Sequence, residues 1–122
     1  MNKKILICDD AELMRRVLKD ILTGAGYTIS GVAEDGEKAC EIYKTQKPDL
    51  VIMDINMPKK DGLETLKEIK EMNQDASVVI CSAMNQPKTV MEMLKAGASD
   101  FIIKPFQAKR VLEVVESIIG EA

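Results

Sequence analysis

Short apolar runs alternate with longer amphipathic segments along this chain. The apolar runs cover residues 5–8, 27–32, 50–53, 77–81 and 101–103. Four of them are continuously apolar, which is typical of strands buried on both faces of a sheet. The run 27–32 is more mixed, with Thr28, Ser30 and Gly31 among its apolar residues, and is better suited to an edge strand.

Between these runs, apolar residues recur with the 3.6-residue period of an amphipathic helix. The clearest stripes are Met14, Val17, Leu18 and Ile21 in the first segment and Val111, Val114, Val115 and Ile118 in the last. Glycine and proline separate the segments. Two acids have the spacing of a helix-capping box, Asp9 before Glu12 and Asp61 before Glu64.

Five strands alternating with five helices predict an α/β fold, a (βα)5 doubly wound parallel sheet with right-handed crossovers and helices on both faces. The 122 residues suit one domain, and we expect a single domain over 1–122 without a separate output domain. Aromatic residues make up only 3 % of the chain, so the core has to be aliphatic.

Composition narrows the classes of function. The net charge of −3 argues against nucleic-acid binding, which needs a concentrated basic surface. The absence of histidine excludes zinc fingers and histidine-based catalytic triads. No apolar run is long enough for a signal peptide or a membrane span. The three separated cysteines, Cys8, Cys40 and Cys81, are expected to be packing residues in a reducing compartment, which favours the cytoplasm.

Polar residues follow four of the five predicted strands. Asp9 and Asp10 come after the first strand, Asp54 ends the third, Ser82 ends the fourth and Lys104 ends the fifth. Parallel α/β sheets bind ligands beyond the carboxyl ends of their strands. If these four strands are neighbours, we expect three carboxylates, a hydroxyl and an ammonium group to meet at one rim.

Three carboxylates about 5 Å apart would repel one another by about 3 kcal/mol per pair at an effective dielectric constant of about 20. A divalent cation removes that repulsion, and an all-oxygen ligand set suits Mg²⁺. The lysine then supplies a positive charge for a phosphate, and the hydroxyl supplies a hydrogen-bond donor. Together with a carboxylate nucleophile, these groups are suited to phosphoryl transfer.

Four stretches at these strand ends resemble the signatures of response-regulator receiver domains, and they occur in that family's order. They are residues 5–10 (ILICDD), 49–62 (DLVIMDINMPKKDG), 81–84 (CSAM) and 104–106 (KPF). The resemblance spans essentially the whole chain, and the last two stretches are most similar to stand-alone chemotaxis regulators. It implies the flavodoxin-like strand order 2-1-3-4-5.

The resemblance implies a role for each acid and for Asn56. Asp54 is the phosphoacceptor. Asp10 and Asp54 bind Mg²⁺ through their side chains, Asn56 binds it through its backbone carbonyl, and Asp9 reaches it through water. By spacing alone, Asp9 is equally well placed to cap the following helix.

The resemblance also implies roles for three residues of the later strands. Ser82 stands where the family most often has threonine. Lys104 contacts the phosphate, and its bond to Pro105 is expected to be cis. Phe101 occupies the position of a switching aromatic residue, and without a hydroxyl only its burial can report the state. Each residue also has a simpler structural interpretation. Ser82 could be a small loop residue, Lys104 a solvent-exposed lysine and Phe101 a core residue.

The function implied is a phosphorylation-driven protein switch. Ser82 moves toward the acyl phosphate, Phe101 turns inward, and the face formed by the fourth helix, fifth strand and fifth helix repacks. Exposed candidates on that face are Lys88, Glu92, Lys95, Ser99, Lys109 and Glu113. The implied partners are a sensor histidine kinase, a flagellar motor switch protein and a phosphatase, with the chain itself monomeric and speeding hydrolysis of its own acyl phosphate.

Three other functions are open to the sequence. A stand-alone phosphorelay intermediate would pass the phosphoryl group to another histidine protein. An aspartate-nucleophile phosphatase of the haloacid-dehalogenase type would need a second acid where Asn56 stands, to act as general acid and base. A flavodoxin-like cofactor carrier would need a phosphate-binding loop after the first strand, where Asp9 and Asp10 would repel phosphate.

Overall fold

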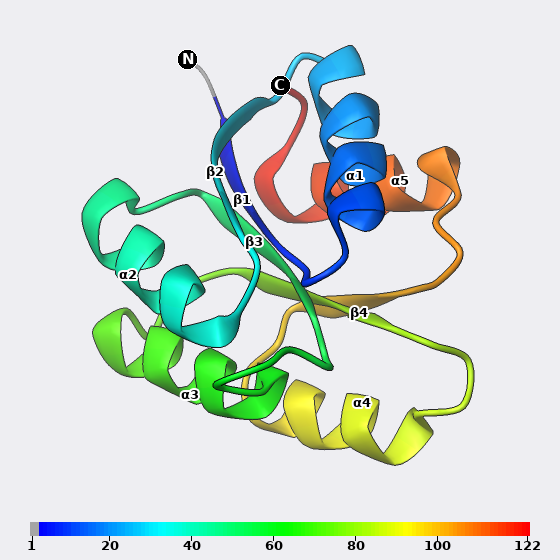
Figure 1. Ribbon diagram of the computed structural model, residues 1–122. Coiled ribbons are helices and arrows are strands. Elements are labelled where there is room, and N and C mark those ends of the chain that lie inside the picture. Colours follow the sequence, from blue (N-terminus) through cyan, green and yellow to red (C-terminus); the bar gives the residue numbers. More distant parts are fainter. Residues whose placement is uncertain (1–2) are drawn as a thin grey trace.

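Strands and helices alternate strictly along the computed structural model, which describes residues 3–122 (Figure 1). The elements are β1 (Lys4–Cys8), α1 (Glu12–Gly24), β2 (Thr28–Ala33), α2 (Gly36–Gln46), β3 (Leu50–Asp54), α3 (Gly62–Met72), β4 (Val78–Ser82), α4 (Pro87–Lys95), β5 (Asp100–Ile103) and α5 (Ala108–Ile119). The predicted (βα)5 pattern is confirmed. Within residues 3–122, no helix combines the length and the apolar character of a membrane span.

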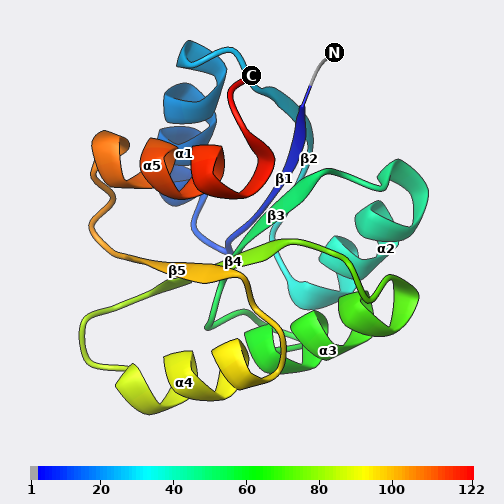
Figure 2. The same ribbon diagram turned by 180° about the vertical axis from the view of Figure 1, so that it is seen from behind.

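The five strands form one parallel sheet in the order β2-β1-β3-β4-β5, as expected. Helices α1 and α5 cover one face of the sheet, and α2, α3 and α4 cover the other (Figures 1 and 2). The chain reverses its direction of winding between β1 and β3, which puts the switch point of the sheet beside the ends of these two strands.

An aliphatic core lies on each face of the sheet, because neighbouring residues of a strand point to opposite faces. In β1, Leu6 packs toward α2, α3 and α4, whereas Ile5 and Ile7 pack toward α1 and α5. Burial of one such side chain contributes about 1.5–3 kcal/mol. This two-sided burial explains why the central strands read as continuous apolar runs.

The last strand departs from the prediction. The sequence predicts β5 as a strand buried on both faces, but only Ile102 is fully buried, and Ile103 is 36 % exposed. The reason is position, because β5 ends the strand order and has a neighbour on one side only. The mixed strand β2 lies at the opposite edge, as predicted.

The two predicted capping boxes have different outcomes. Asp61 caps α3, accepting a hydrogen bond from the Glu64 N–H at 2.9 Å. The capping role predicted for Asp9 is wrong, because α1 starts at Glu12 and Ala11 is its N-cap residue. Asp9 instead accepts a hydrogen bond from the Ala11 N–H at 2.9 Å, in the turn before the helix.

Gly36, at the start of α2, abuts the loop that joins β3 to α3. A methyl group at this position would collide with the Lys60 carbonyl and the Thr65 hydroxyl. We therefore expect Gly36→Ala to lower the free energy of unfolding by about 1–3 kcal/mol, the usual cost of overpacking. Gly24, in the last turn of α1, has open space around it, so Gly24→Ala serves as the control and should be neutral or stabilising by up to about 1 kcal/mol in urea denaturation. Equal effects of the two substitutions would contradict the close packing at Gly36.

Candidate functional site

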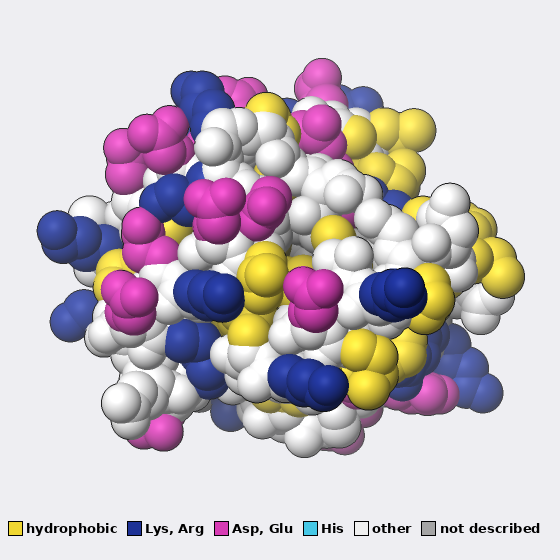
Figure 3. All heavy atoms as spheres, turned by 90° about the horizontal axis from the view of Figure 1, so that it is seen from below, with side chains coloured by type: hydrophobic (Ala, Val, Ile, Leu, Met, Phe, Trp, Pro, Cys, Tyr) yellow, Lys and Arg dark blue, Asp and Glu magenta, His cyan; other side chains and the backbone are white. Residues whose placement is uncertain are grey.

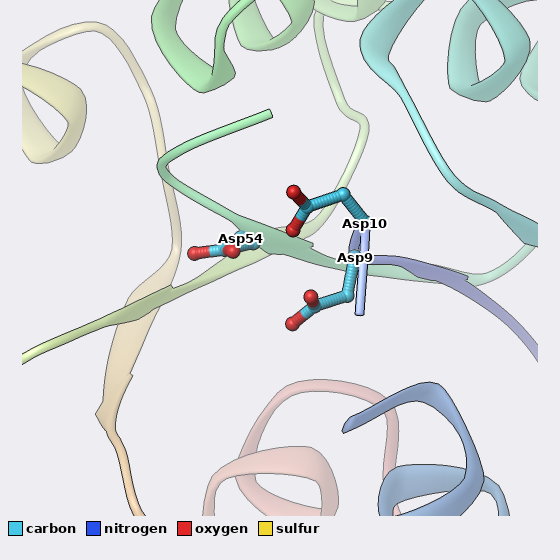
Figure 4. A group of neighbouring side chains, drawn as sticks. All are labelled: Asp9, Asp10 and Asp54. Carbon is cyan, nitrogen blue, oxygen red and sulfur yellow. The ribbon is translucent and has the colours of Figure 1, made fainter. Parts of the chain in front are cut away.

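Three carboxylates meet where β1 and β3 end. The sheet register pairs Cys8 with Met53, so the residues that follow, Asp9 and Asp54, lie side by side. Asp9 and Asp10 project to opposite sides of the chain after β1, and Asp54 projects from β3 beside them (Figure 4). Each of the three offers a carboxylate oxygen, and these oxygens lie within 4.8 Å of one another. Asp9 and Asp54 are 1 % and 7 % exposed, whereas Asp10 faces solvent.

Lys104 brings a positive charge to the two buried carboxylates. Ile103 pairs with Ser82 in the sheet, and the next backbone N–H, that of Lys104, donates to the Ser82 carbonyl at 2.8 Å. The Lys104 Nζ then lies 3.0 Å from Asp9 Oδ2 and 3.2 Å from Asp54 Oδ2. The peptide bond from Lys104 to Pro105 is cis, as the resemblance implied.

Burial of the site and its excess of negative over positive charges shift the pKa values of Asp54 and Lys104. Burial, together with the nearby Asp9 charge, raises the pKa of Asp54 above its ordinary value, and Lys104 only partly offsets this. Burial alone would lower the pKa of Lys104, but the combined attraction of Asp9 and Asp54 outweighs it and raises that pKa. Lys104 pairs with Asp9 and Asp54 but not with Asp10, so the three carboxylates have one ammonium group among them, which leaves negative charge for a further cation to neutralise.

Asn56 lies in the loop that follows β3, next to the carboxylate cluster. Its backbone N–H donates a long hydrogen bond of 3.4 Å to Asp54 Oδ1. The loop backbone is therefore close to the acid that precedes it. The ligand atoms that the cluster offers are carboxylate oxygens, the kind of ligand that Mg²⁺ prefers.

Ser82 and Phe101 are linked through an apolar cavity next to the site. The Ser82 hydroxyl is fully buried and donates to the Ala83 carbonyl at 2.7 Å, so its proton is directed to its own loop and not to the carboxylates. Ser82 and the half-buried Phe101 both line a cavity of about 230 Å³ under α4, together with Val90 and Leu94. This pocket, which is partly open to solvent, thus lies next to both the buried serine and the aromatic ring.

Two residues near the site were not predicted from the sequence. Arg15, on α1, donates from Nη1 to the Asp9 carbonyl at 2.7 Å. Gln86, just before α4, contacts both Ser82 and Asn56 through its side-chain amide. Neither residue has a local motif around it, and their contacts depend on the packing of loops that are distant in sequence.

The cysteines have no place in this chemistry. Cys8, Cys40 and Cys81 are all buried and unpaired. Burial raises the pKa of each thiol, that of Cys40 to about 12, so the nucleophilic thiolate is scarce at neutral pH. They pack in the core, as predicted.

The surface carries charges of both signs. Acidic, basic and hydrophobic side chains are interspersed on the side where α3 and α4 lie (Figure 3). The residues proposed for the face of α4, β5 and α5 are all exposed, namely Lys88, Glu92, Lys95, Ser99, Lys109 and Glu113. Met84 is 82 % exposed at the edge of the same region.

A (βα)5 sheet with an acid cluster and a lysine at its strand ends defines a receiver domain. The model of the response regulator receiver domain family matches residues 5–116, and the chain belongs to this family. Members of the family bind Mg²⁺ at an acidic pocket and act as signalling domains of two-component systems.

The similar proteins include chemotaxis regulators. The chain is 50 % identical to the chemotaxis protein CheY of Thermotoga maritima over 118 residues, which cover 97 % of this chain and 98 % of that protein. It is also 50 % identical to CheY of Bacillus subtilis over 120 residues, covering 98 % and 100 % of the two chains. One chain of the solved CheX–CheY complex with BeF₃ and Mg²⁺ from Borrelia burgdorferi is also similar to this protein. The two chains superpose with a TM-score of 0.91 and are 37 % identical, and the match covers 95 % of this chain and 88 % of that one.

Proposed function

We propose that this protein is a phosphorylation-activated switch of chemotaxis. Asp54 accepts a phosphoryl group from a sensor histidine kinase, and the modified protein then binds a flagellar motor switch protein. The observation that carries the proposal is the position of Asp54, with Lys104 Nζ 3.2 Å away and the carboxylate oxygens of Asp9 and Asp10 within 4.8 Å. The similarity to the two CheY proteins supports the chemotaxis assignment.

In the transfer step, the phosphoryl group passes from the kinase histidine to Asp54. An Asp54 carboxylate oxygen forms a bond to phosphorus while the N–P bond of the kinase phosphohistidine breaks, and the released imidazole takes up a proton. Lys104 lies beside the carboxylate that reacts and is positively charged at neutral pH, so it stabilises the negative charge that accumulates on the phosphoryl oxygens. We expect water to attack the same phosphorus later, which returns the free carboxylate.

We propose that Asp10 and Asp54 bind Mg²⁺ through their side chains, Asn56 through its backbone carbonyl and Asp9 through water. The all-oxygen donor set and the excess of carboxylates over cations fit this ion. When bound, Mg²⁺ supplies positive charge to the carboxylates and to the phosphoryl oxygens.

Modification of Asp54 adds charge and hydrogen-bond acceptors beside Ser82. We propose that the Ser82 hydroxyl turns to donate to the phosphoryl group and that Phe101 moves into the adjoining cavity. The cavity of about 230 Å³ that both residues line supports this coupling. The outcome is a change of the face formed by α4, β5 and α5, which partners distinguish by differential affinity.

The direct test is phosphorylation of the purified protein by acetyl phosphate, a small phosphodonor that bypasses the kinase. We expect one phosphoryl group per chain, added only in the presence of Mg²⁺, lost with EDTA and released by hydroxylamine as an acyl phosphate is. Labelling that persists without a divalent cation, or that resists hydroxylamine, would contradict the proposed chemistry.

The output can be tested with beryllofluoride, which mimics the acyl phosphate. The loaded protein is expected to retain a purified flagellar switch protein from the same organism, and the unloaded protein is not. Retention of a histidine phosphotransfer protein alone would instead identify a phosphorelay intermediate. The Borrelia CheY forms its complex with CheX in the presence of BeF₃ and Mg²⁺, so a purified CheX-like protein is a third candidate for capture.

Mg²⁺ alone should stabilise the folded protein, because it binds a site that the unfolded chain lacks. At a concentration ten times its dissociation constant, the gain is about 1.4 kcal/mol, which raises the melting temperature by roughly 5 °C for a domain of this size. Asp10→Asn removes a proposed ligand that is exposed and unpaired with Lys104, so this variant should fold but lose most of the gain. Thermal melts with and without Mg²⁺ measure the effect, and equal gains in the two proteins would exclude Asp10 as a ligand.

A further inference from the structure

We propose that Gln86 is a positioning residue that stabilises the unphosphorylated arrangement of the site, by joining the loop after β4 to the loop after β3. This inference rests on the proposed function, since it assigns a role to Gln86 in the switching of Ser82. Gln86 directly precedes α4, the first helix of the face that is expected to respond.

One side-chain amide makes contacts on both sides. Gln86 Oε1 accepts a hydrogen bond from the Ala83 N–H at 3.3 Å and lies 3.5 Å from the Ser82 hydroxyl. Its Nε2 donates to Asn56 Oδ1 at 3.4 Å, across a separation of 30 residues in the chain. Gln86 therefore connects the hydroxyl expected to switch with the loop that follows the phosphoacceptor.

These contacts compete with the phosphorylated arrangement. A serine hydroxyl has one proton, and in this structure that proton is directed to the Ala83 carbonyl, with Gln86 Oε1 as a second acceptor nearby. Donation to a group on Asp54 requires the hydroxyl to leave both acceptors. The hydrogen bonds of Gln86 to Ala83 and Asn56 hold the two loops in the geometry that must be left, so they oppose the change.

The contacts are also weak enough to be reversible. All three are between 3.3 and 3.5 Å, longer than typical protein hydrogen bonds. The Gln86 side chain makes no capping hydrogen bond to α4, whose start is set by Pro87 at its first turn. Removal of the side chain is therefore not expected to unfold the helix, and a change in ligand affinity can be measured on a folded protein.

The test compares the affinity of wild type and Gln86→Ala for beryllofluoride in saturating Mg²⁺, measured by calorimetry. We expect Gln86→Ala to bind about three- to tenfold more tightly, the range for loss of one or two modest hydrogen bonds that stabilise only the unliganded state. Asn85→Ala removes an exposed amide from the neighbouring position and is expected to leave the affinity unchanged.

A double-mutant cycle separates positioning from a general structural effect. Asn56→Ala removes the acceptor of Gln86 Nε2 but keeps the backbone carbonyl proposed to bind Mg²⁺. In that background, Gln86→Ala should change the affinity by a smaller factor than it does in the wild type, whereas a purely structural effect would be additive. Unchanged or weaker beryllofluoride binding by Gln86→Ala, with normal binding by the wild type, overturns the role of Gln86 alone. A wild-type protein that binds no beryllofluoride overturns the proposed function and this inference with it.

Discussion

Asp54→Asn is expected to abolish phosphorylation by acetyl phosphate in Mg²⁺, with a loss of more than about a thousandfold in the labelling rate. An amide has nearly the same shape as a carboxylate but lacks the charge and the nucleophilic oxygen that form the acyl phosphate. Burial and the nearby Asp9 raise the pKa of Asp54, which means that the fold disfavours its negative charge. Because the substitution removes this charge, the fold should not be lost with the activity. Phosphate-affinity electrophoresis or intact-protein mass spectrometry gives the readout.

Two further variants make the result specific. Asp20→Asn changes an exposed acid on α1, away from the strand ends, and should be labelled at the wild-type rate. Asp10→Asn keeps the nucleophile and is expected to be labelled slowly, with recovery at higher Mg²⁺ concentrations. Undiminished labelling of Asp54→Asn would transfer the phosphoacceptor role to another residue, and peptide mapping would identify it.

Much of the site could be predicted because strand ends are easy to locate. The apolar runs stop abruptly at Asp9, Asp54 and Lys104, and parallel strands bring their ends to one rim whatever lies between them in sequence. The register then determines the contacts, since Cys8 pairs with Met53 and Asp9 follows beside Asp54. Periodicity and rim position were thus sufficient to bring together groups separated by as many as 95 residues.

The features that the sequence could not predict depend on the directions of side chains, on which strands lie at the edges of the sheet, and on contacts between loops. Asp9 has the spacing of a helix cap, but Lys104 pairs with one of its oxygens and the Ala11 N–H with the other, which leaves no role at the helix. The apolar run of β5 gives no sign that one flank of the strand is open. The contacts of Gln86 depend on how two loops approach each other, and no local pattern encodes that approach.

The same excess of carboxylates that suits the site for Mg²⁺ is unfavourable for folding. Asp9 and Asp54 are buried side by side, and Lys104 is the cation that the structure brings to both. Stability and chemistry therefore depend on one ammonium group. Its removal should lower both the free energy of unfolding and the rate of phosphorylation.

Lys104→Ala is expected to lower the free energy of unfolding by about 2 kcal/mol at neutral pH, because it leaves two buried carboxylates without their partner. Lys59, which pairs with Asp35 at 3.7 Å and is 63 % exposed, is the matched control. Lys59→Ala should cost less than about 1 kcal/mol, as exposed ion pairs do. Lys104→Ala should also slow labelling by acetyl phosphate strongly, whereas Lys59→Ala should not.

The pH dependence identifies the cause of the destabilisation. The pKa of Asp54 is already raised by burial and by Asp9, and loss of Lys104 raises it further. The folded variant then binds a proton more readily than the unfolded chain does, so its stability falls as the pH rises through the folded-state pKa. The deficit relative to wild type should therefore shrink as the pH is lowered from neutral toward the ordinary aspartate pKa. Added Mg²⁺ should reduce the same deficit at neutral pH. If the loss of stability were the same at low pH and in Mg²⁺ as at neutral pH without Mg²⁺, Lys104 would stabilise the fold through packing of its alkyl chain and not through its charge.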